Sequence, residues 1–279
     1  MFENAVAIVT GAGSGVGLAL AEELAQRKCE VIMADREADS VAVAAEKIRT
    51  RGGNATAVEL DVRNFDDFQA LVADTVERAG RVDYLFNNAG VIVAGSSHLY
   101  DIESWNLVYD TNVRGVFNGV QSVYPLMVKQ GFGHIINTSS ALGLSVVGGV
   151  RLAAYAATKH AVVGLSKCLR PEAAAHGVRV SVLCPSVVRT PLMDGGKFGR
   201  LHSESPKELH RRGELAFPMD PKRFARKALD QVARNVGVII LPRRIRWFLR
   251  CVRCLSAAAE MGLAKYADHI SRKGTPAEP

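Results

Sequence analysis

Short apolar runs alternate with amphipathic helical segments along most of this chain. The runs are almost continuously apolar, which is typical of strands that helices cover on both faces. Strands that alternate with helices favour parallel pairing, because each helical crossover returns the chain to the same end of the sheet. The sequence therefore predicts an α/β fold with a doubly wound, seven-stranded parallel sheet and helices on both faces. The predicted strands span residues 5–10, 30–34, 55–60, 82–86, 134–138, 178–183 and 236–241.

Length and composition favour one domain. The chain has 279 residues and 48% hydrophobic content, and no linker, repeat or low-complexity tract divides it. We therefore expect a single domain over residues 1–279. Met1 lies a few residues before the first predicted strand, and no apolar run approaches the ~20 residues of a bilayer span, so we expect a cytoplasmic protein.

The five cysteines do not suggest a disulfide framework. Their number is odd and their positions are scattered. Cys251 and Cys254 form an isolated C-x-x-C pair with no second cluster of cysteine or histidine nearby. We expect neither a metal site nor a redox site there.

A glycine-rich turn, GAGSGVG at residues 11–17, follows the first predicted strand and precedes a helical pattern at residues 18–26. Glycines allow close approach of the backbone to a ligand, and the amides of a helix N-terminus attract a pyrophosphate. Strand, glycine turn and helix together are typical of dinucleotide binding. The spacing fits T-G-x-x-x-G-x-G, with Thr10, Gly11, Gly15 and Gly17, better than G-x-G-x-x-G. A glycine-rich turn without a ligand is the alternative.

Asp35 ends the second predicted strand, about 20 residues beyond the glycine turn. Its carboxylate is suited to accept hydrogen bonds from an adenosine ribose and to repel a 2′-phosphate. Arg36 keeps NADP as an alternative, because a guanidinium can pair with that phosphate. Ser14 occupies a place in the turn where a basic residue would have offered a further phosphate partner. The sequence therefore favours NAD over NADP.

Tyr155 and Lys159 are four residues apart in a helical segment, which places an ammonium beside a phenol. A nearby cation favours the phenolate, and this pairing suggests general acid–base chemistry. The spacing alone also occurs by chance in many helices. Ser140 follows the strand at 134–138, and its hydroxyl is expected at the ligand crevice. Asn112 lies in a long helical pattern at 105–128, where a buried amide requires hydrogen-bond partners.

Taken in this order, these motifs resemble those of the short-chain dehydrogenase/reductase family over roughly the first 190 residues. The resemblance also includes Asp61-Val62, Asn87-Asn88-Ala89-Gly90 and the segment 185–190. It implies a Rossmann fold and an NAD(P)-dependent enzyme that acts on CH–OH groups, interconverting a secondary alcohol and a ketone. Two departures are visible: Ser186 replaces the usual glycine after Pro185, and the stretch between Ser140 and Tyr155 is slightly longer than usual.

The resemblance also assigns roles. Tyr155 becomes the general acid/base, Ser140 steadies the substrate oxygen, Lys159 binds the nicotinamide ribose, and Asn112 holds a water of a proton relay. Residues 61–62 are expected at adenine, 88–90 along the cofactor cleft and 185–190 at the nicotinamide. The expected cofactor-binding residues are Gly11, Ser14, Gly15, Val16, Gly17, Asp35, Arg36, Asp61, Val62, Asn88, Ala89, Gly90, Tyr155, Lys159, Pro185, Val188 and Thr190.

The resemblance makes residues 191–219 the substrate-binding loop. This segment lacks clear periodicity and is rich in glycine and charge, which suggests a mobile lid. We expect an apolar alcohol or ketone substrate and a homodimer or homotetramer. A non-catalytic dinucleotide-sensing or membrane-peripheral protein that keeps this fold is the alternative from another class.

Positive charge is concentrated in the C-terminal third. Residues 1–190 hold 17 basic and 19 acidic side chains, whereas residues 191–279 hold 18 and 9, which together give the net charge of +7. Within the extension 242–279, residues 242–255 predict a basic amphipathic helix. We expect it to dock on the protein, near the cleft or a subunit interface. Weak contact with an anionic membrane is the alternative, and no nucleic-acid-binding motif is recognisable. The expected docking residues are Trp247, Phe248, Leu249 and Val252.

Overall fold

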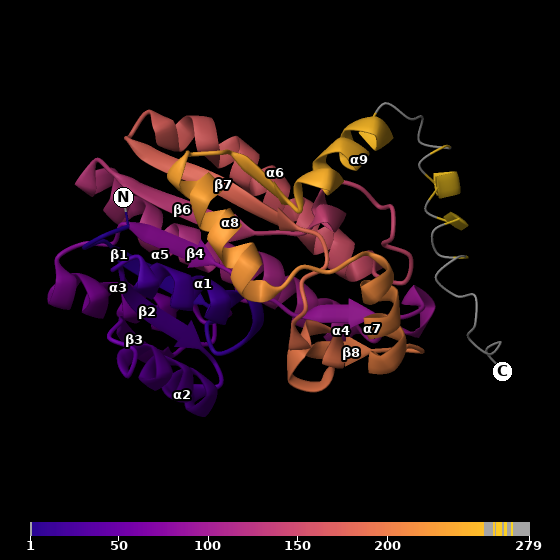
Figure 1. Ribbon diagram of the computed structural model, residues 1–279, viewed down its shortest axis with the longest axis horizontal. Coiled ribbons are helices and arrows are strands. Elements are labelled where there is room, and N and C mark those ends of the chain that lie inside the picture. Colours follow the sequence, from indigo (N-terminus) through magenta and orange to yellow (C-terminus); the bar gives the residue numbers. More distant parts are fainter. Residues whose placement is uncertain (1, 254–258, 260, 264, 267–268, 270–279) are drawn as a thin grey trace.

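The computed structural model describes residues 2–253, 259, 261–263, 265, 266 and 269. Seven parallel strands form one sheet in the order β3-β2-β1-β4-β6-β7-β9 (Figure 1). The predicted sheet is confirmed, and strand ends differ from the predicted ones by at most two residues. The strands are β1 (Val6–Thr10), β2 (Glu30–Asp35), β3 (Asn54–Glu59), β4 (Tyr84–Asn87), β6 (Gly133–Thr138), β7 (Val178–Pro185) and β9 (Val238–Leu241).

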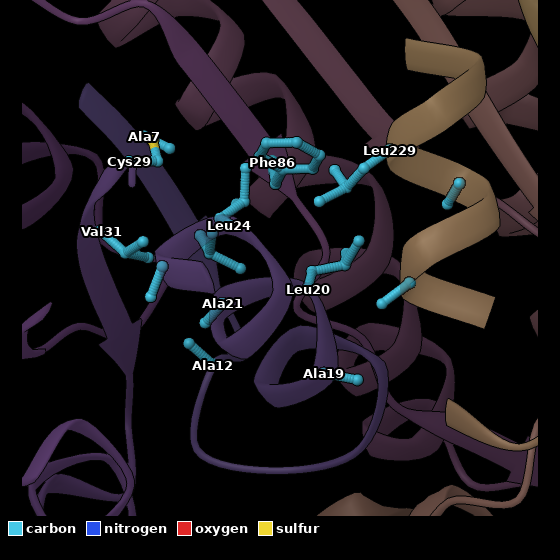
Figure 2. Close-up of a cluster of buried hydrophobic side chains, with 14 of the residues drawn as sticks. Ala7, Ala12, Ala19, Leu20, Ala21, Leu24, Cys29, Val31, Phe86 and Leu229 are labelled. Atoms are coloured by element: carbon cyan, nitrogen blue, oxygen red, sulfur yellow. The ribbon is translucent and has the colours of Figure 1, made fainter. Parts of the chain in front are cut away.

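Helices cover both faces of the sheet, as the apolar strands require. Alternate residues of β1 point to opposite faces, so Ala7 and Val9 enter one core and Val6 and Ile8 the other. Figure 2 shows the first core, where Leu20, Leu24 and Leu229 approach Phe86 of the sheet. The helices are α1 (Gly15–Gln26), α2 (Ala38–Arg49), α3 (Phe65–Ala79), α4 (Ile102–Tyr109), α5 (Gly115–Gln130), α6 (Ala153–Ala174), α7 (Pro206–Leu215), α8 (Pro221–Ala233) and α9 (Arg243–Arg253).

The strand order reverses between β1 and β4. The chain proceeds outward from β1 to β2 and β3, and then returns to place β4 on the other side of β1. Loops that leave the carboxyl ends of β1 and β4 therefore diverge, which opens a crevice between them. The glycine turn and the segment Asn88–Gly90 both begin at this crevice.

The segment 191–219 is more regular than its sequence suggested. It contains two 3₁₀ turns (Pro191–Asp194 and Gly196–Phe198), the strand β8 (Gly199–Leu201) and α7. Strand β8 pairs with β5 (Ile92–Ala94) in a separate two-stranded parallel sheet. The sequence pattern did not indicate these elements, and the mobility expected of the segment stays a prediction. A strand of three residues carries little periodic signal. Its pairing partner also lies more than 100 residues away in the sequence, where local patterns do not reveal it.

The predicted C-terminal helix is present as α9, which projects from the sheet beyond β9 (Figure 1). Leu249 is buried, but Trp247 and Phe248 are 68% and 42% exposed. Leu249 therefore packs on the protein and Phe248 lines the cavity, whereas docking of Trp247 at a subunit interface stays a prediction. The side chain of Val252 and the predicted end of the helix at residues 254–255 lie outside the described parts. Among the described residues, no helix is long and apolar enough to cross a bilayer.

Candidate active site

A cavity of about 730 Å³ opens where the carboxyl ends of β1, β4, β6 and β7 meet. This volume falls within the range of roughly 300–1,000 Å³ that small-molecule and cofactor sites occupy. The cavity wall contains every predicted site residue except Gly17 and Asn112, which lie behind it. The structure therefore brings the residues of separate sequence motifs together at one crevice.

The glycine turn lines one end of the cavity. Gly11 and Gly15 have φ values of 66° and 56°, a region that favours glycine. A Cβ atom at Gly17 would lie 2.0 Å from the carbonyl oxygen of Gly11. Gly17 therefore allows α1 to pack closely against the turn, and it does not line the cavity. Ser14 is the N-cap of α1, and its side chain makes no capping hydrogen bond. The amides of this first helical turn are therefore suited to bind a phosphate.

Thr10 joins the ends of β1 and β4. Its hydroxyl accepts hydrogen bonds from the backbone N–H groups of Asn88 and Ala89, both at 3.0 Å. In return, Nδ2 of Asn88 donates to the Thr10 carbonyl at 3.1 Å. A Cβ atom on Gly11 would lie 2.9 Å from the Cα of Ala89, so the two segments are in close contact. The glycine motif includes Thr10, but its spacing did not indicate this anchoring role.

Asp35 and Arg36 stand side by side at the cavity wall but have different partners. The Asp35 carboxylate accepts hydrogen bonds from the Gly13 amide at 2.9 Å and from the Glu37 amide at 3.1 Å. The Arg36 guanidinium donates to the carbonyl of Lys197 at 2.6 Å and to the Glu37 carboxylate at 3.3 Å. Asp35 is thus fixed beside the glycine turn, whereas Arg36 reaches toward the substrate loop.

Asp61 and Val62 follow β3 and contribute to the same wall. Arg63 donates to both carboxylate oxygens of Asp61, with its Nε at 2.9 and 3.0 Å. These hydrogen bonds hold the pKa of Asp61 below its usual value. Asp61 is therefore ionised and paired with Arg63, and the two residues line the cavity together.

Tyr155, Lys159 and Ser140 meet at the end of the cavity away from Asp35. The Tyr155 hydroxyl is hydrogen-bonded to the side chain of Ser140. Nζ of Lys159 lies 5.4 Å from the centre of the Tyr155 ring and donates to the carbonyl of Thr138 at 3.1 Å. Ser139 points elsewhere, because its hydroxyl donates to the Lys159 carbonyl at 2.7 Å. Of the two serines, Ser140 is thus the one that contacts the tyrosine.

Burial dominates the proton affinities of this pair. It raises the pKa of Tyr155 to about 12, and the hydrogen bond with Ser140 opposes this only in part. It lowers the pKa of Lys159 to about 8. The sequence had suggested that the lysine would favour the phenolate, but loss of solvation outweighs that attraction in the structure. At neutral pH the tyrosine is a neutral phenol and the lysine remains charged.

Asn112 lies in a π-helical turn, Asp110–Arg114, that joins α4 to α5. Its side chain is fully buried and uses both ends of its amide. Oδ1 accepts from the Val91 amide at 2.8 Å, while Nδ2 donates to the Val91 carbonyl at 3.0 Å and to the Thr158 hydroxyl at 3.2 Å. Asn112 therefore clamps the segment after β4 to α6, one residue before Lys159. Such turns often occur at functional sites.

The segment 185–190 lies beside the glycine turn, and Pro185, Val188 and Thr190 line the cavity as expected. A Cβ atom on Gly15 would lie 3.3 Å from the Cβ of Thr190, so this segment meets the glycine turn directly. Ser186 also lines the cavity, and its φ is not positive. A serine therefore fits this position without backbone strain.

Beyond Tyr155 the cavity is largely apolar. The sequence indicated a substrate loop here but did not identify its individual contacts. The longer stretch before Tyr155 and the C-terminal extension both contribute to this part of the wall. Its apolar lining residues include Leu142, Val147, Val150, Leu152, Leu192, Met193, Leu209, Leu215, Phe248, Leu263 and Tyr266.

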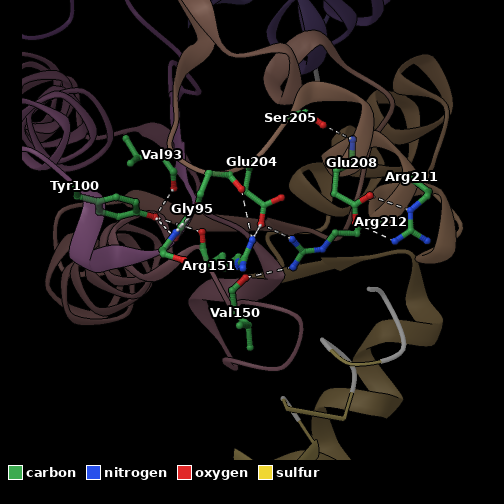
Figure 3. Close-up of polar contacts among 12 residues, drawn as sticks. Val93, Gly95, Tyr100, Val150, Arg151, Glu204, Ser205, Glu208, Arg211 and Arg212 are labelled. Atoms are coloured by element: carbon green, nitrogen blue, oxygen red, sulfur yellow. Dashed lines mark hydrogen bonds and ion pairs between the residues drawn. The ribbon is translucent and has the colours of Figure 1, made fainter. Parts of the chain in front are cut away.

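A buried ion-pair cluster holds this part of the wall together (Figure 3). Glu204, whose side chain is 2% exposed, bonds to Arg151 at 3.2 Å and to Arg212 at 2.9 Å. Arg151 has a φ of 66°, and its carbonyl lies 3.2 Å from the Tyr100 hydroxyl. The cluster thus links the substrate loop to the segment before Tyr155. Sequence patterns cannot find it, because its members are far apart in the chain.

The residues present fit a nicotinamide dinucleotide. The glycine turn and the start of α1 suit a pyrophosphate, Asp35 is placed for an adenosine ribose, and Ser140, Tyr155 and Lys159 lie at the opposite end. Among the described residues, no group of histidine, cysteine, aspartate or glutamate could hold a metal ion. Fold and site together define an oxidoreductase that uses a nicotinamide dinucleotide.

Comparison with known proteins identifies the family. The family model described as short chain dehydrogenase matches residues 5–197, and the chain therefore belongs to that family. Cyclohexanol dehydrogenase of an Acinetobacter strain is 33% identical over 218 residues, which are 78% of this chain and 84% of the relative.

Two solved structures show the same fold with different cofactors. A short-chain dehydrogenase/reductase from Burkholderia phymatum in complex with NAD has a TM-score of 0.82 and 29% identity, covering 100% of this chain and 98% of its own. A variant of actinorhodin polyketide ketoreductase with NADPH has a TM-score of 0.73 and 31% identity, covering 85% and 95%. The comparisons thus support a nicotinamide dinucleotide without choosing between NAD and NADP.

Proposed function

We propose that this enzyme interconverts a secondary alcohol and a ketone with NAD as its cofactor. The observation that carries the proposal is the contact between Tyr155 and Ser140, beside Lys159, in a cavity that continues to the glycine turn. A proton donor, an oxygen-binding hydroxyl and a cation are the groups that carbinol chemistry requires. The similarity to cyclohexanol dehydrogenase supports the same class of reaction.

The bound nicotinamide supplies the hydride acceptor or donor, and the protein supplies position and proton transfer. In reduction, the neutral phenol of Tyr155 donates its proton to the oxygen of the former carbonyl while Ser140 holds that oxygen. In oxidation, Tyr155 takes the hydroxyl proton, and it must first lose its own. The charged Lys159 then favours the phenolate, because an opposite charge lowers the pKa of a phenol.

Lys159 also binds the nicotinamide ribose in this proposal, and Asn112 assists from behind the wall. A Cβ atom on Gly90 would lie 3.2 Å from Oδ1 of Asn112 and 3.4 Å from Nζ of Lys159, so both side chains approach the same glycine. We assign to Asn112 the clamping of this region and the holding of a water that connects Lys159 to solvent.

NAD is preferred to NADP in this proposal because of Asp35. Its carboxylate is held beside the glycine turn by two backbone amides and would repel a 2′-phosphate. Arg36 could offset that repulsion only by leaving its contacts with Lys197 and Glu37.

The substrate is an apolar alcohol or ketone in this proposal, in keeping with the lining beyond Tyr155. Assembly through α4 and α5 is part of the proposal, because they expose Ile102, Trp105, Tyr109 and Phe117. A second copy of the chain would cover this face as a homodimer or homotetramer. Cys29, Cys168, Cys184 and Cys251 are free thiols, which is typical of proteins in the reducing cytoplasm, and we include that location in the proposal.

The deciding experiment is a dehydrogenase screen across aliphatic, aromatic and steroidal secondary alcohols, each with NAD and with NADP. We expect turnover of at least one apolar alcohol and a higher kcat/KM with NAD. A preference for NADP would contradict the role given to Asp35. Tight dinucleotide binding without turnover of any alcohol or ketone would favour a non-catalytic dinucleotide-sensing protein.

A further inference from the structure

Six large apolar side chains are exposed around the outer end of the cavity, and we call them the rim patch. Three of them, Leu215, Phe248 and Tyr266, both line the cavity and are 54%, 42% and 62% exposed, so they mark its mouth. The segments that carry them are far apart in the sequence. The rim patch consists of Leu215, Phe217, Trp247, Phe248, Met261 and Tyr266.

Direct contacts join the two sides of this patch. The Arg244 guanidinium donates to the Phe217 carbonyl at 2.7 Å and lies 5.2 Å from the centre of the Phe217 ring. The end of α7 therefore meets the start of α9. Phe217 and Trp247 remain 72% and 68% exposed despite this contact. Apolar side chains gathered in this way on a soluble protein mark an interaction site.

The same helix is strongly basic. Arg243, Arg244, Arg246 and Arg250 are exposed, and α9 contains no acidic residue. The Arg250 guanidinium lies 5.2 Å from the centre of the Trp247 ring. Arginine and aromatic side chains together on an amphipathic helix are typical of helices that lie in the headgroup region of a membrane. Residues 1–190 have a net charge of −2, so the positive charge belongs to this end of the molecule.

We propose that the rim patch and α9 bind an anionic membrane surface. Given the proposed function, the cavity mouth then faces the bilayer, and an apolar alcohol or ketone dissolved in the membrane can enter directly. A second copy of the chain fits this surface less well. A two-fold interface would place each patch against itself and bring the arginines of two α9 helices together. Anionic headgroups instead complement the arginines while the acyl chains cover the aromatic side chains.

The test is co-sedimentation of the full-length protein with vesicles of phosphatidylcholine alone or mixed with phosphatidylglycerol. We expect binding to the anionic vesicles, release at high salt and weak binding to the neutral ones. Neutralising two arginines, Arg243→Gln with Arg246→Gln, should weaken binding by about fivefold for each charge. The matched control is Arg223→Gln with Lys227→Gln, which removes two exposed charges from α8 and should cause little loss.

A second pair of variants tests the apolar contribution. Trp247→Ser should reduce vesicle binding, whereas Phe132→Ser should leave it unchanged, because Phe132 precedes β6 at the amino ends of the parallel strands and α9 follows the carboxyl end of β9. Absence of binding to anionic vesicles, or equal losses in variant and control, would overturn the proposal. A change of oligomeric state in Trp247→Ser without loss of vesicle binding would identify a subunit interface instead.

Vesicle binding and alcohol turnover are separate measurements, so the proposed enzyme function and the proposed membrane surface are tested independently. Vesicle binding without alcohol turnover would refute the enzyme but leave the membrane surface standing. Turnover of a water-soluble alcohol without vesicle binding would support the enzyme function and refute the membrane surface. The Arg243→Gln with Arg246→Gln variant should keep the wild-type kcat on that water-soluble alcohol.

Discussion

Replacing Lys159 by methionine should make the protein more stable at neutral pH while inactivating it. Lys159 is 4% exposed, and burial lowers its pKa from 10.5 to about 8. Below pH 8 the lysine is charged in both folded and unfolded chains, so the full cost of burying the charge is present. That cost falls as the pH rises from 8 to 10.5, because the folded lysine is then neutral while the unfolded one still carries its proton.

The structure sets the magnitude. A difference between pKa values of 10.5 and about 8 corresponds to about 3 kcal/mol, at about 1.4 kcal/mol per pH unit. Methionine removes the charge and nearly preserves the volume, but it loses the hydrogen bond to the Thr138 carbonyl, which contributes about 1 kcal/mol. Lys159→Met should therefore be about 2 kcal/mol more stable than the wild type at pH 7. This advantage should disappear near pH 10.

Urea unfolding of the two proteins at pH 7 and pH 10, followed by circular dichroism, measures this difference. Lys167→Met is the matched control, because Lys167 is exposed on the same helix. Its effect should be small at both pH values. If the free energy of unfolding of Lys159→Met relative to wild type is the same at pH 7 and pH 10, burial of the Lys159 charge imposes no cost.

Two further substitutions test the cofactor end of the cavity. Asp35→Ser should narrow or reverse the preference for NAD in kcat/KM, since the repulsive carboxylate is gone; an unchanged preference would remove Asp35 from that role. Gly17→Ala should destabilise the protein by about 1–3 kcal/mol and weaken NAD binding, because its Cβ would lie 2.0 Å from the Gly11 carbonyl oxygen. In the matched control Gly164→Ala, the new Cβ has no neighbour within 4 Å, so equal destabilisation by both changes would argue against the packing role of Gly17.

Local patterns predicted the sheet and the residues of the candidate site. The glycine turn and the pair Tyr155 and Lys159 are recognisable within a few residues, because their spacing on a turn or helix fixes their geometry. Ser140 was predictable from its place after a strand. The cavity brings these residues together, as the order of strands in a doubly wound sheet requires.

Features that depend on distant partners could not be predicted. Strand β8 exists because it pairs with β5, and Glu204 is buried because Arg151 and Arg212 enclose it. The direction of the Tyr155 pKa was mispredicted because spacing reveals the neighbouring charge but not the loss of solvent. Amphipathicity predicted α9 but not which side chains remain exposed, since that depends on the shape of the surface beneath it.

Comparison of wild type with Tyr155→Phe in NAD-linked oxidation of an apolar secondary alcohol tests the proton-transfer role of Tyr155. We expect wild-type turnover, a loss of about 100-fold or more in kcat for Tyr155→Phe, and nearly unchanged NAD affinity in a direct titration. Tyr109→Phe, which removes a hydroxyl from α4 outside the cavity lining, serves as the control and should keep full activity. If Tyr155→Phe retains most of the wild-type kcat, Tyr155 is not the proton-transfer group and the proposed chemistry is wrong.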